Sequence, residues 1–128
     1  MGISDFIVKE GIQGSGVFTT KKYAPGEVVH EMQGEILSHP TRTSVQVGEK
    51  RHIEDAVGVH VNHHCQPNVR VDWKDASLVA LRVIQVGEEI TFDYNQNEEH
   101  MANPFICQCC GRLIEGQHVK SEKSAPVK

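Results

Sequence analysis

The chain has 128 residues, enough for one domain with its own hydrophobic core, and 38% of them are apolar. Thirteen Lys and Arg residues stand against seventeen Asp and Glu residues, which gives a formal net charge of −4. A chain with this balance lacks the basic field that grips a phosphate backbone, so direct binding of nucleic acid is not expected.

The N-terminal residues carry no signal for export. Met1 to Asp5 has no positively charged flank followed by an apolar stretch, so no secretory leader is predicted. No run of residues approaches the roughly 18 apolar residues that a membrane-spanning helix needs. The chain is therefore predicted to be soluble and intracellular, with no membrane partner.

Apolar residues mostly alternate with polar ones, which predicts a mainly β chain with several small sheets. The expected strands cover residues 5–9, 16–20, 27–32, 43–47, 57–61, 69–73, 78–83 and 89–92. Pro and Gly within Ala24–Glu27, and Gly within Gln85–Glu88, predict two tight turns between strands. From Asn95 to Asn103 the polar sequence favours at most a short helix.

Gly14, Ser15 and Gly16 lie between the first two expected strands. One interpretation is a hairpin turn. The other is a binding loop without bulky side chains, in which a ligand lies against backbone amides and carbonyls. A dinucleotide-binding fingerprint is excluded, because Thr19 stands where the third glycine belongs and no helix is expected to follow.

The segment Asn62–Asn68, with the sequence NHHCQPN, directly follows a run of alternating valines. Such a cluster of polar and reactive side chains at the end of a strand indicates a functional site. In the alternative interpretation, Asn62 and His63 satisfy nearby backbone groups and Cys65 is a small buried hydrophobic residue. These residues by themselves leave both interpretations open.

The segment Gly87–Tyr94, with the sequence GEEITFDY, predicts a strand whose large side chains share one face. Simple burial of Ile90, Phe92 and Tyr94 would explain this alternation. Tyr94 is the informative member, since a buried phenol needs either a hydrogen-bond partner or a function.

Three of the four cysteines are crowded into residues 107–110. In a reducing compartment, this clustering favours metal binding or redox chemistry over a disulfide framework. The candidate ligands of one tetrahedral zinc ion are Cys65, Cys107, Cys109 and Cys110. Because two adjacent cysteines cannot easily both face one ion, His118 or His64 is an alternative ligand. Free thiols are the competing interpretation.

Taken together and in order, these segments resemble the SET domain of protein lysine methyltransferases. Gly14–Phe18 is similar to the family's G-x-G-V/L opening, NHHCQPN to its N-H-S-C-x-P-N signature, and GEEITFDY to its G-E-E-L-T-Y/F-D-Y segment. The segment from Phe105 to Gly116 is similar to a post-SET element. The resemblance implies a SET domain over residues 1–104 and a post-SET-like cysteine segment over residues 105–116. The polar tail, residues 117–128, is expected to be flexible.

The resemblance implies a fold of several small β-sheets with a C-terminal pseudoknot that brings the regions of Asn62 and Tyr94 together. It also implies S-adenosylmethionine as the cofactor, contacted by Gly14, Ser15, Gly16, Asn62, His63 and Tyr94. Tyr94 would be the catalytic residue, and Phe92 would line the substrate channel.

The activity implied by the resemblance is methyl transfer from S-adenosylmethionine to the side-chain amine of a lysine in a protein. The acidic balance of the chain suits a histone tail or another basic protein as substrate. Residues 38–55, where many members of the family carry a long insert, form a short segment, so pairing of two copies is a hypothesis for completing the peptide groove. The alternatives are a SET-like module that binds peptide or cofactor without turnover, and a metal centre built from the His and Cys residues.

Overall fold

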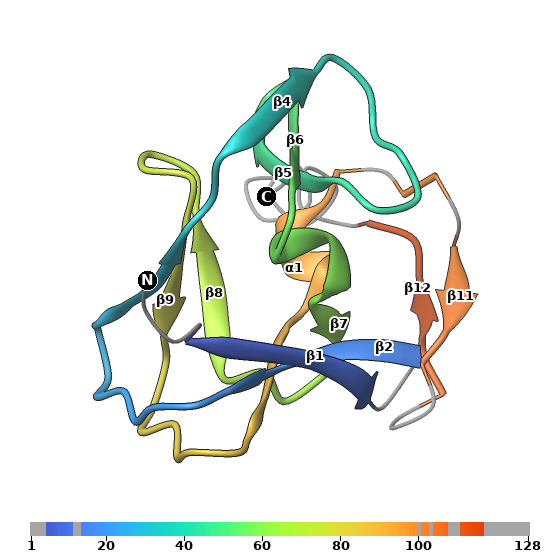
Figure 1. Ribbon diagram of the computed structural model, residues 1–128. Helices are drawn as coiled ribbons and strands as arrows, with labels where there is room; N and C mark the ends of the chain where they lie inside the picture. The colour runs from blue at the N-terminus through green and yellow to red at the C-terminus, as the bar shows by residue number, and fades with distance from the viewer. Residues whose placement is uncertain (1–4, 12–13, 100, 103, 108–110, 117–128) are drawn as a thin grey trace, which may run out of the picture.

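The computed structural model describes residues 5–11, 14–99, 101–102, 104–107 and 111–116. Over these residues the chain forms short strands in four small sheets, and helical structure is confined to two single turns (Figure 1). The prediction of a mainly β fold with several small sheets is therefore confirmed. Among the described residues, no helix is long and apolar enough to cross a membrane. The predicted flexible tail, residues 117–128, lies outside the described residues.

The four-stranded sheet joins parts of the chain that are far apart in sequence. Its strands, in spatial order, are β1 (Phe6–Gly11), β2 (Gly14–Thr19), β10 (Glu89–Phe92) and β7 (Asn62–His63). β1 and β2 form an antiparallel hairpin, and β2 pairs in the antiparallel sense with β10. β10 also pairs in the parallel sense with β7, so it stands between the G-x-G segment and the NHHCQPN segment.

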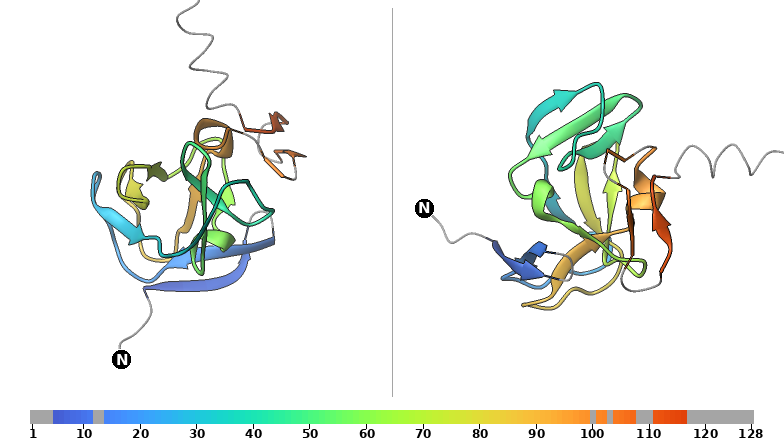
Figure 2. Two further views of the ribbon diagram at one scale, coloured as in Figure 1. Left: turned by 90° about the horizontal axis from the view of Figure 1, so that it is seen from above. Right: turned by 90° about the vertical axis from the view of Figure 1, so that its right-hand side faces the viewer.

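Three smaller sheets complete the fold and enclose the core (Figure 2). One contains β3 (Val28–Glu31), β9 (Ser77–Ala80) and β8 (Val69–Asp72). Another contains β4 (Gly34–Leu37), β6 (Arg51–Asp55) and β5 (Val45–Gly48). The last is the hairpin of β11 (Phe105–Ile106) and β12 (Leu113–Ile114), which lies beside the single α-helical turn α1 (Tyr94–Asn97).

The core is built from aliphatic side chains that the alternating strands turn inward. Val17 of β2 and Ile90 of β10 are register partners, and both side chains are fully buried. Leu78 and Val69 bring the sheet of β8 and β9 into the same cluster, and Val45 and Ile53 bring in the sheet of β5 and β6. Each side chain of this size contributes roughly 1.5–3 kcal/mol on burial, so the core holds β10 firmly in the middle of the four-stranded sheet.

The two tight turns expected from Pro and Gly are present. Gly26 and Gly87 have φ angles of +85° and +91°, in the left-handed region that glycine adopts without a steric penalty. The two segments that contain these turns are joined by an isolated antiparallel bridge of Tyr23 and Ile84. β10 begins directly after the turn at Gly87.

The strand predicted over residues 57–61 is wrong, because Gly58–His60 forms a 3-10 turn, η1. The Asp55 carboxylate accepts hydrogen bonds from the backbone N–H groups of Val57, at 2.9 Å, and Gly58, at 2.7 Å, which curls the chain. A Cβ atom at Gly58 would lie 3.1 Å from the Met32 sulfur, so glycine also permits the close packing of this turn.

Two strands that the sequence analysis did not predict, β4 and β6, form one sheet with β5, whose Gln46 carbonyl accepts a hydrogen bond from Asn97 of α1. β6 contains Arg51, Glu54 and Asp55, and such charged residues are depleted in strands. The charge of Glu54 is stabilised by nearby donors, because its carboxylate accepts hydrogen bonds from the hydroxyls of Thr41 and Thr43. These contacts shape the loop between β4 and β5.

Candidate functional site

The three sequence motifs come together along β10. Glu89 and Ile90 pair with Phe18 and Val17 of β2 on one side, while Thr91 and Phe92 pair with β7 on the other. The Asn68 side chain extends this pairing, because its amide accepts from the Thr91 N–H at 2.9 Å and donates to the Glu89 carbonyl at 2.8 Å. The strand therefore fixes the relative positions of all three segments.

The Asn62 side chain bridges β7 to the G-x-G segment. Its Nδ2 donates to the Ser15 carbonyl at 3.0 Å and to Oε2 of Glu89 at 2.7 Å. A Cβ atom on Gly16 would lie 2.3 Å from the same carboxylate oxygen and 3.2 Å from the Asn62 Nδ2 atom. A residue larger than glycine at position 16 would therefore displace the Glu89 carboxylate from its hydrogen bond with Asn62.

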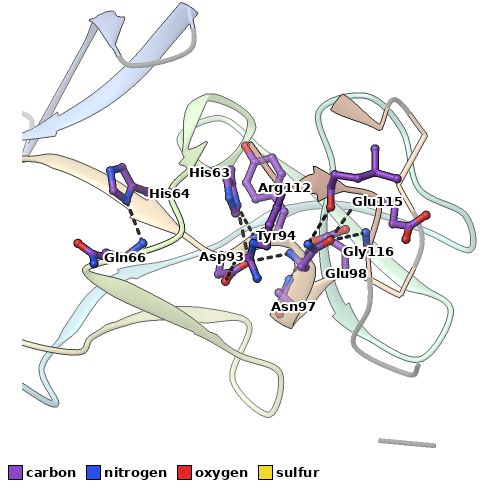
Figure 3. A network of polar contacts seen from close by, with 12 residues as sticks. His63, His64, Gln66, Asp93, Tyr94, Asn97, Glu98, Arg112, Glu115 and Gly116 are labelled. Atoms are coloured by element: carbon purple, nitrogen blue, oxygen red, sulfur yellow. Dashed lines mark hydrogen bonds and ion pairs between the residues drawn. The ribbon is translucent and has the colours of Figure 1, made fainter. Parts of the chain in front are cut away.

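His63 is almost completely buried, with 1% of its surface exposed. Its Nδ1 atom accepts a hydrogen bond from the Tyr94 backbone N–H at 3.0 Å (Figure 3). Burial lowers the pKa of this imidazole, although Asp93, 3.7 Å away, acts in the opposite direction. The neutral ring then carries its proton on Nε2, for which the described residues provide no hydrogen-bond partner. His63 is thus a buried donor in need of an acceptor.

Tyr94 begins the helical turn α1, which Asp93 caps by accepting a hydrogen bond from the Asn95 N–H at 3.0 Å. The Tyr94 hydroxyl donates to the Val61 carbonyl at 2.5 Å. Burial, followed by the negative charges of Glu98 and Glu89, raises the pKa of this phenol far above its ordinary value. Tyr94 therefore stays protonated and its hydroxyl is held in one place.

Other aromatic rings pack against the Tyr94 ring. The Tyr94 ring lies 4.8 Å from the ring of Phe92 and 6.0 Å from the ring of Phe105, which also contacts His63. These contacts create a dry, polarisable environment around the phenol. Because Phe105 comes from β11, the C-terminal hairpin contributes to the same site.

A pocket opens beside Tyr94 and Phe92. Its walls are formed by Val61, by the helical turn α1, and by the loop that leads from β4 into β5. The lining residues outside α1 and β10 are Pro40, Thr41, Arg42, Thr43, Ser44, Val45, Gly58, Val59, Val61, Glu98, Met101 and Ala102. The phenol and the phenyl ring thus face a slot between two parts of the chain that are far apart in sequence.

The SET-domain family model matches residues 14–95, which include β2, β7, β10 and Tyr94. The chain belongs to the SET-domain family. The matched part contains all three segments that meet along β10. The resemblance inferred from the G-x-G, NHHCQPN and GEEITFDY segments is therefore confirmed.

Curated relatives of this SET domain are named as methyltransferases. The chain is 34% identical, over 76% of its length, to a histone-lysine N-methyltransferase, H3 lysine-36 specific, from Yarrowia lipolytica. It is 37% identical, over 59% of its length, to methyltransferase flvH from Aspergillus flavus. It is 26% identical, over 84% of its length, to human histone-lysine N-methyltransferase 2B. The chain spans only 16%, 47% and 5% of these three proteins, respectively.

Two acidic residues of this SET domain were not predicted as part of the site. Glu89 of β10 accepts a hydrogen bond from Asn62 of the adjacent strand β7, and Glu98 lines the pocket beside Tyr94. For Glu89, the sequence showed only that it lies within the GEEITFDY segment, and its contact with Asn62 comes from the pairing of β10 with β7. Glu98 gave no signal, because it lies in a polar segment and is placed only by the tertiary fold.

The predicted zinc site is not supported by the described residues. Cys65 is half-buried and Cys107 is buried. No group of three or more His, Cys, Asp or Glu side chains that could hold a metal ion is found in the part of the chain that the structure describes. Cys109, Cys110 and His118 lie outside that part, so the complete ligand set is not placed.

The segment that follows the cysteines is anchored by Asn95. Its side chain donates to the Leu113 carbonyl at 3.1 Å and accepts from the backbone N–H groups of Glu115 and Gly116 at 3.0 and 2.9 Å. This buried amide fixes the hairpin of β11 and β12 next to α1. It was also missed in the sequence, where Asn95 was treated only as a helix boundary.

Proposed function

We propose that this chain is a protein-lysine N-methyltransferase that uses S-adenosylmethionine. The observation that carries the proposal is the convergence of Gly16, Asn62 and Tyr94 around one central strand, β10. Further support comes from family membership and from relatives that are named as histone-lysine methyltransferases.

The residues around Gly16 fit the amino-acid end of this cofactor. The Ser15 carbonyl and the Glu89 carboxylate both accept from the Asn62 Nδ2 group, and such acceptors suit an ammonium group. The buried Nε2 donor of His63 fits a polar ring atom, so the adenine end is assigned to its neighbourhood. S-Adenosylmethionine supplies, when bound, an electrophilic methyl group on a cationic sulfonium.

The pocket beside Tyr94 is the proposed channel for the substrate lysine. Only a neutral amine is a nucleophile, and keeping a lysine neutral at pH 7 costs roughly 4 to 5 kcal/mol. The aromatic walls formed by Phe92 and Tyr94 disfavour the ammonium form, as burial does in general. The fixed Tyr94 hydroxyl oxygen can accept an N–H of the amine and orient its lone pair. Tyr94 is the proposed catalytic residue, and Phe92 is the channel wall.

A histone is the proposed substrate, with histone H3 first because of the names of the relatives. A net charge of −4 is consistent with a basic tail as partner. Because histones are intracellular proteins, the same proposal implies an intracellular location for this chain. Pairing of two copies remains a hypothesis, and its test is the oligomeric state in solution.

The direct test is incubation of the chain with methyl-labelled S-adenosylmethionine and purified core histones, followed by mass-spectrometric mapping of the modified residue. Label in a histone lysine is the expected result. Cofactor uptake by calorimetry without any transfer, to histones or to a cell lysate, would favour the non-catalytic binding module. Failure to bind the cofactor would contradict both readings.

A further inference from the structure

Glu98 is a buried acidic residue at the edge of the pocket. Glu98 is the residue directly after α1, and only 5% of it is exposed. Its backbone N–H donates to the Tyr94 carbonyl at 2.8 Å, so the two residues lie one helical turn apart on the same face. The Glu98 carboxyl therefore shares the pocket with the Tyr94 phenol.

The hydrogen bonds to the Glu98 carboxyl fall on one of its oxygens. Oε2 accepts from the Gln46 backbone N–H and from the Asn97 side-chain amide, both at 2.8 Å. Within the described ranges no Lys, Arg or His forms an ion pair with it. No described residue donates a hydrogen bond to Oε1, while the two hydrogen bonds to Oε2 hold the carboxyl in a fixed orientation.

The charged surroundings of Glu98 come from several elements. Glu99 adjoins it in the chain, Arg42 lies on the opposite wall of the pocket, and the Tyr94 phenol lies one turn away. Burial raises the pKa of Glu98 to about 7, and Glu99 acts in the same direction, while the hydrogen bonds from Gln46 and Asn97 oppose the shift. This carboxyl therefore exchanges a proton near neutral pH.

The other titratable groups on the pocket wall cannot accept a proton. An arginine such as Arg42 is always charged, and the Tyr94 phenol is protonated and donates to the Val61 carbonyl. His63 lies outside the pocket lining, and its Nδ1 is already occupied by the Tyr94 N–H. Glu98 is the remaining acceptor among the described lining residues.

We propose that the Glu98 carboxylate accepts the proton that the substrate lysine must lose before methylation. An N–H bond of the ammonium breaks, its electron pair stays on nitrogen as the nucleophilic lone pair, and the proton binds Oε1 of Glu98. The carboxylic acid then releases the proton to solvent when the product leaves. This inference rests on the proposed function, since it requires a lysine in the pocket.

The test compares Glu98→Gln with Glu99→Gln. Both glutamates accept a hydrogen bond from Gln46, Glu98 from its backbone N–H and Glu99 from its side-chain amide at 2.6 Å. Only Glu98 lines the pocket. Turnover would be measured from pH 6 to 10 with a histone H3 peptide and with the same peptide carrying aminoethylcysteine, a less basic amine, in place of lysine. Thermal unfolding and cofactor affinity would be recorded for both variants.

Glu98→Gln should lower kcat/KM on the lysine peptide about 10²-fold near pH 8, within the range of general base catalysis. The loss should shrink towards pH 10, where the amine deprotonates unaided, and it should be smaller for aminoethylcysteine. Glu99→Gln should keep the parent activity at pH 8 and above, while its break should move to a lower pH than in the parent chain, because the negative charge of Glu99 helps to raise the pKa of Glu98. An equal loss at every pH and on both amines would show a structural role and overturn the inference.

The parent protein provides a second measurement that does not depend on the folding of a variant. Its kcat/KM should rise with a break near pH 7 and then level off. A profile that climbs tenfold per pH unit without a break as far as pH 9 would overturn the role of Glu98 while leaving the methyltransferase function intact. A parent chain that methylates neither peptide nor histones would instead remove the proposed function, and this inference with it.

Discussion

The Tyr94 hydroxyl donates a 2.5 Å hydrogen bond to the carbonyl of Val61, the residue directly before Asn62. This bond joins the first residue of α1 to the residue that precedes β7, in addition to the parallel pairing of β7 with β10. The same carbonyl that orients the phenol therefore belongs to the segment proposed to hold the cofactor. A small displacement of either segment would change the geometry of both.

Removal of this hydroxyl in Tyr94→Phe should reduce methyl transfer by roughly 10²-fold or more, because orientation of the amine would be lost. Cofactor affinity should change little, and stability should fall by about 1 kcal/mol from the lost hydrogen bond. Tyr23→Phe is the matched control, since the buried Tyr23 hydroxyl also donates to a backbone carbonyl, that of Val29 at 3.4 Å. Equal activity of Tyr94→Phe and the parent chain in the labelling assay would remove Tyr94 from the site.

A methyl group at position 16 should damage cofactor binding selectively. In Gly16→Ala, the new Cβ would meet the Glu89 carboxylate at 2.3 Å and the Asn62 amide at 3.2 Å, so both side chains must move. We expect at least a tenfold weaker affinity for S-adenosylmethionine by calorimetry. In the control Gly48→Ala, the new methyl group would contact only the flexible Arg51 side chain, at 3.3 Å, and unchanged affinity is expected there. Equal affinities in both variants would speak against a cofactor site at Gly16.

The number of methyl groups added should depend on Phe92. This side chain is 3% exposed, lines the pocket and lies 4.8 Å from the Tyr94 ring. A phenyl ring has no hydroxyl to hold a water molecule, which leaves space for a methylated amine to turn. The parent chain should form products beyond monomethyl-lysine, and Phe92→Tyr should shift the distribution towards monomethyl-lysine. Mass spectrometry that finds only monomethyl-lysine from the parent chain would contradict this prediction.

Stability should fall in acid because of Asp55. Burial by itself would raise the pKa of this carboxyl, but hydrogen bonds from His30, Gln33 and Gly58 outweigh it and lower the pKa to about 2. A depressed folded-state pKa means that the stabilisation is complete above about pH 4 and is lost as the pH falls towards 2. The loss should be about 2 kcal/mol.

Chemical denaturation at pH 6 and pH 2.5 measures this loss, with Asp55→Asn as the comparison. The amide that this substitution introduces cannot be protonated in this range, so the variant should lose less stability between the two pH values than the parent chain. Its overall stability should be lower at pH 6, since η1 depends on the carboxylate. An equal pH dependence of both proteins would show that other carboxyls cause the acid sensitivity.

Local sequence was sufficient for strands whose alternation and turns agree, such as β1, β2 and β10. It failed where side-chain contacts outweigh local propensity. The valines at 57, 59 and 61 alternate as in a strand, yet the Asp55 carboxylate draws the backbone into η1. β6 was missed because its charged residues do not look like a strand in the sequence. In the fold, Glu54 of β6 is stabilised by hydrogen bonds from the hydroxyls of Thr41 and Thr43.

The sequence by itself determined the mainly β class, the SET family and the residues placed around β10, because these depend on local pattern and on motifs whose order is fixed in the chain. Only the tertiary structure decided that Glu89 lies against Asn62 and that Glu98 shares a pocket with Tyr94. Those relationships arise from strand pairing and burial between segments far apart in the chain. The proton affinity of a carboxyl such as Glu98 depends on the neighbours that folding gives it, which no local pattern specifies.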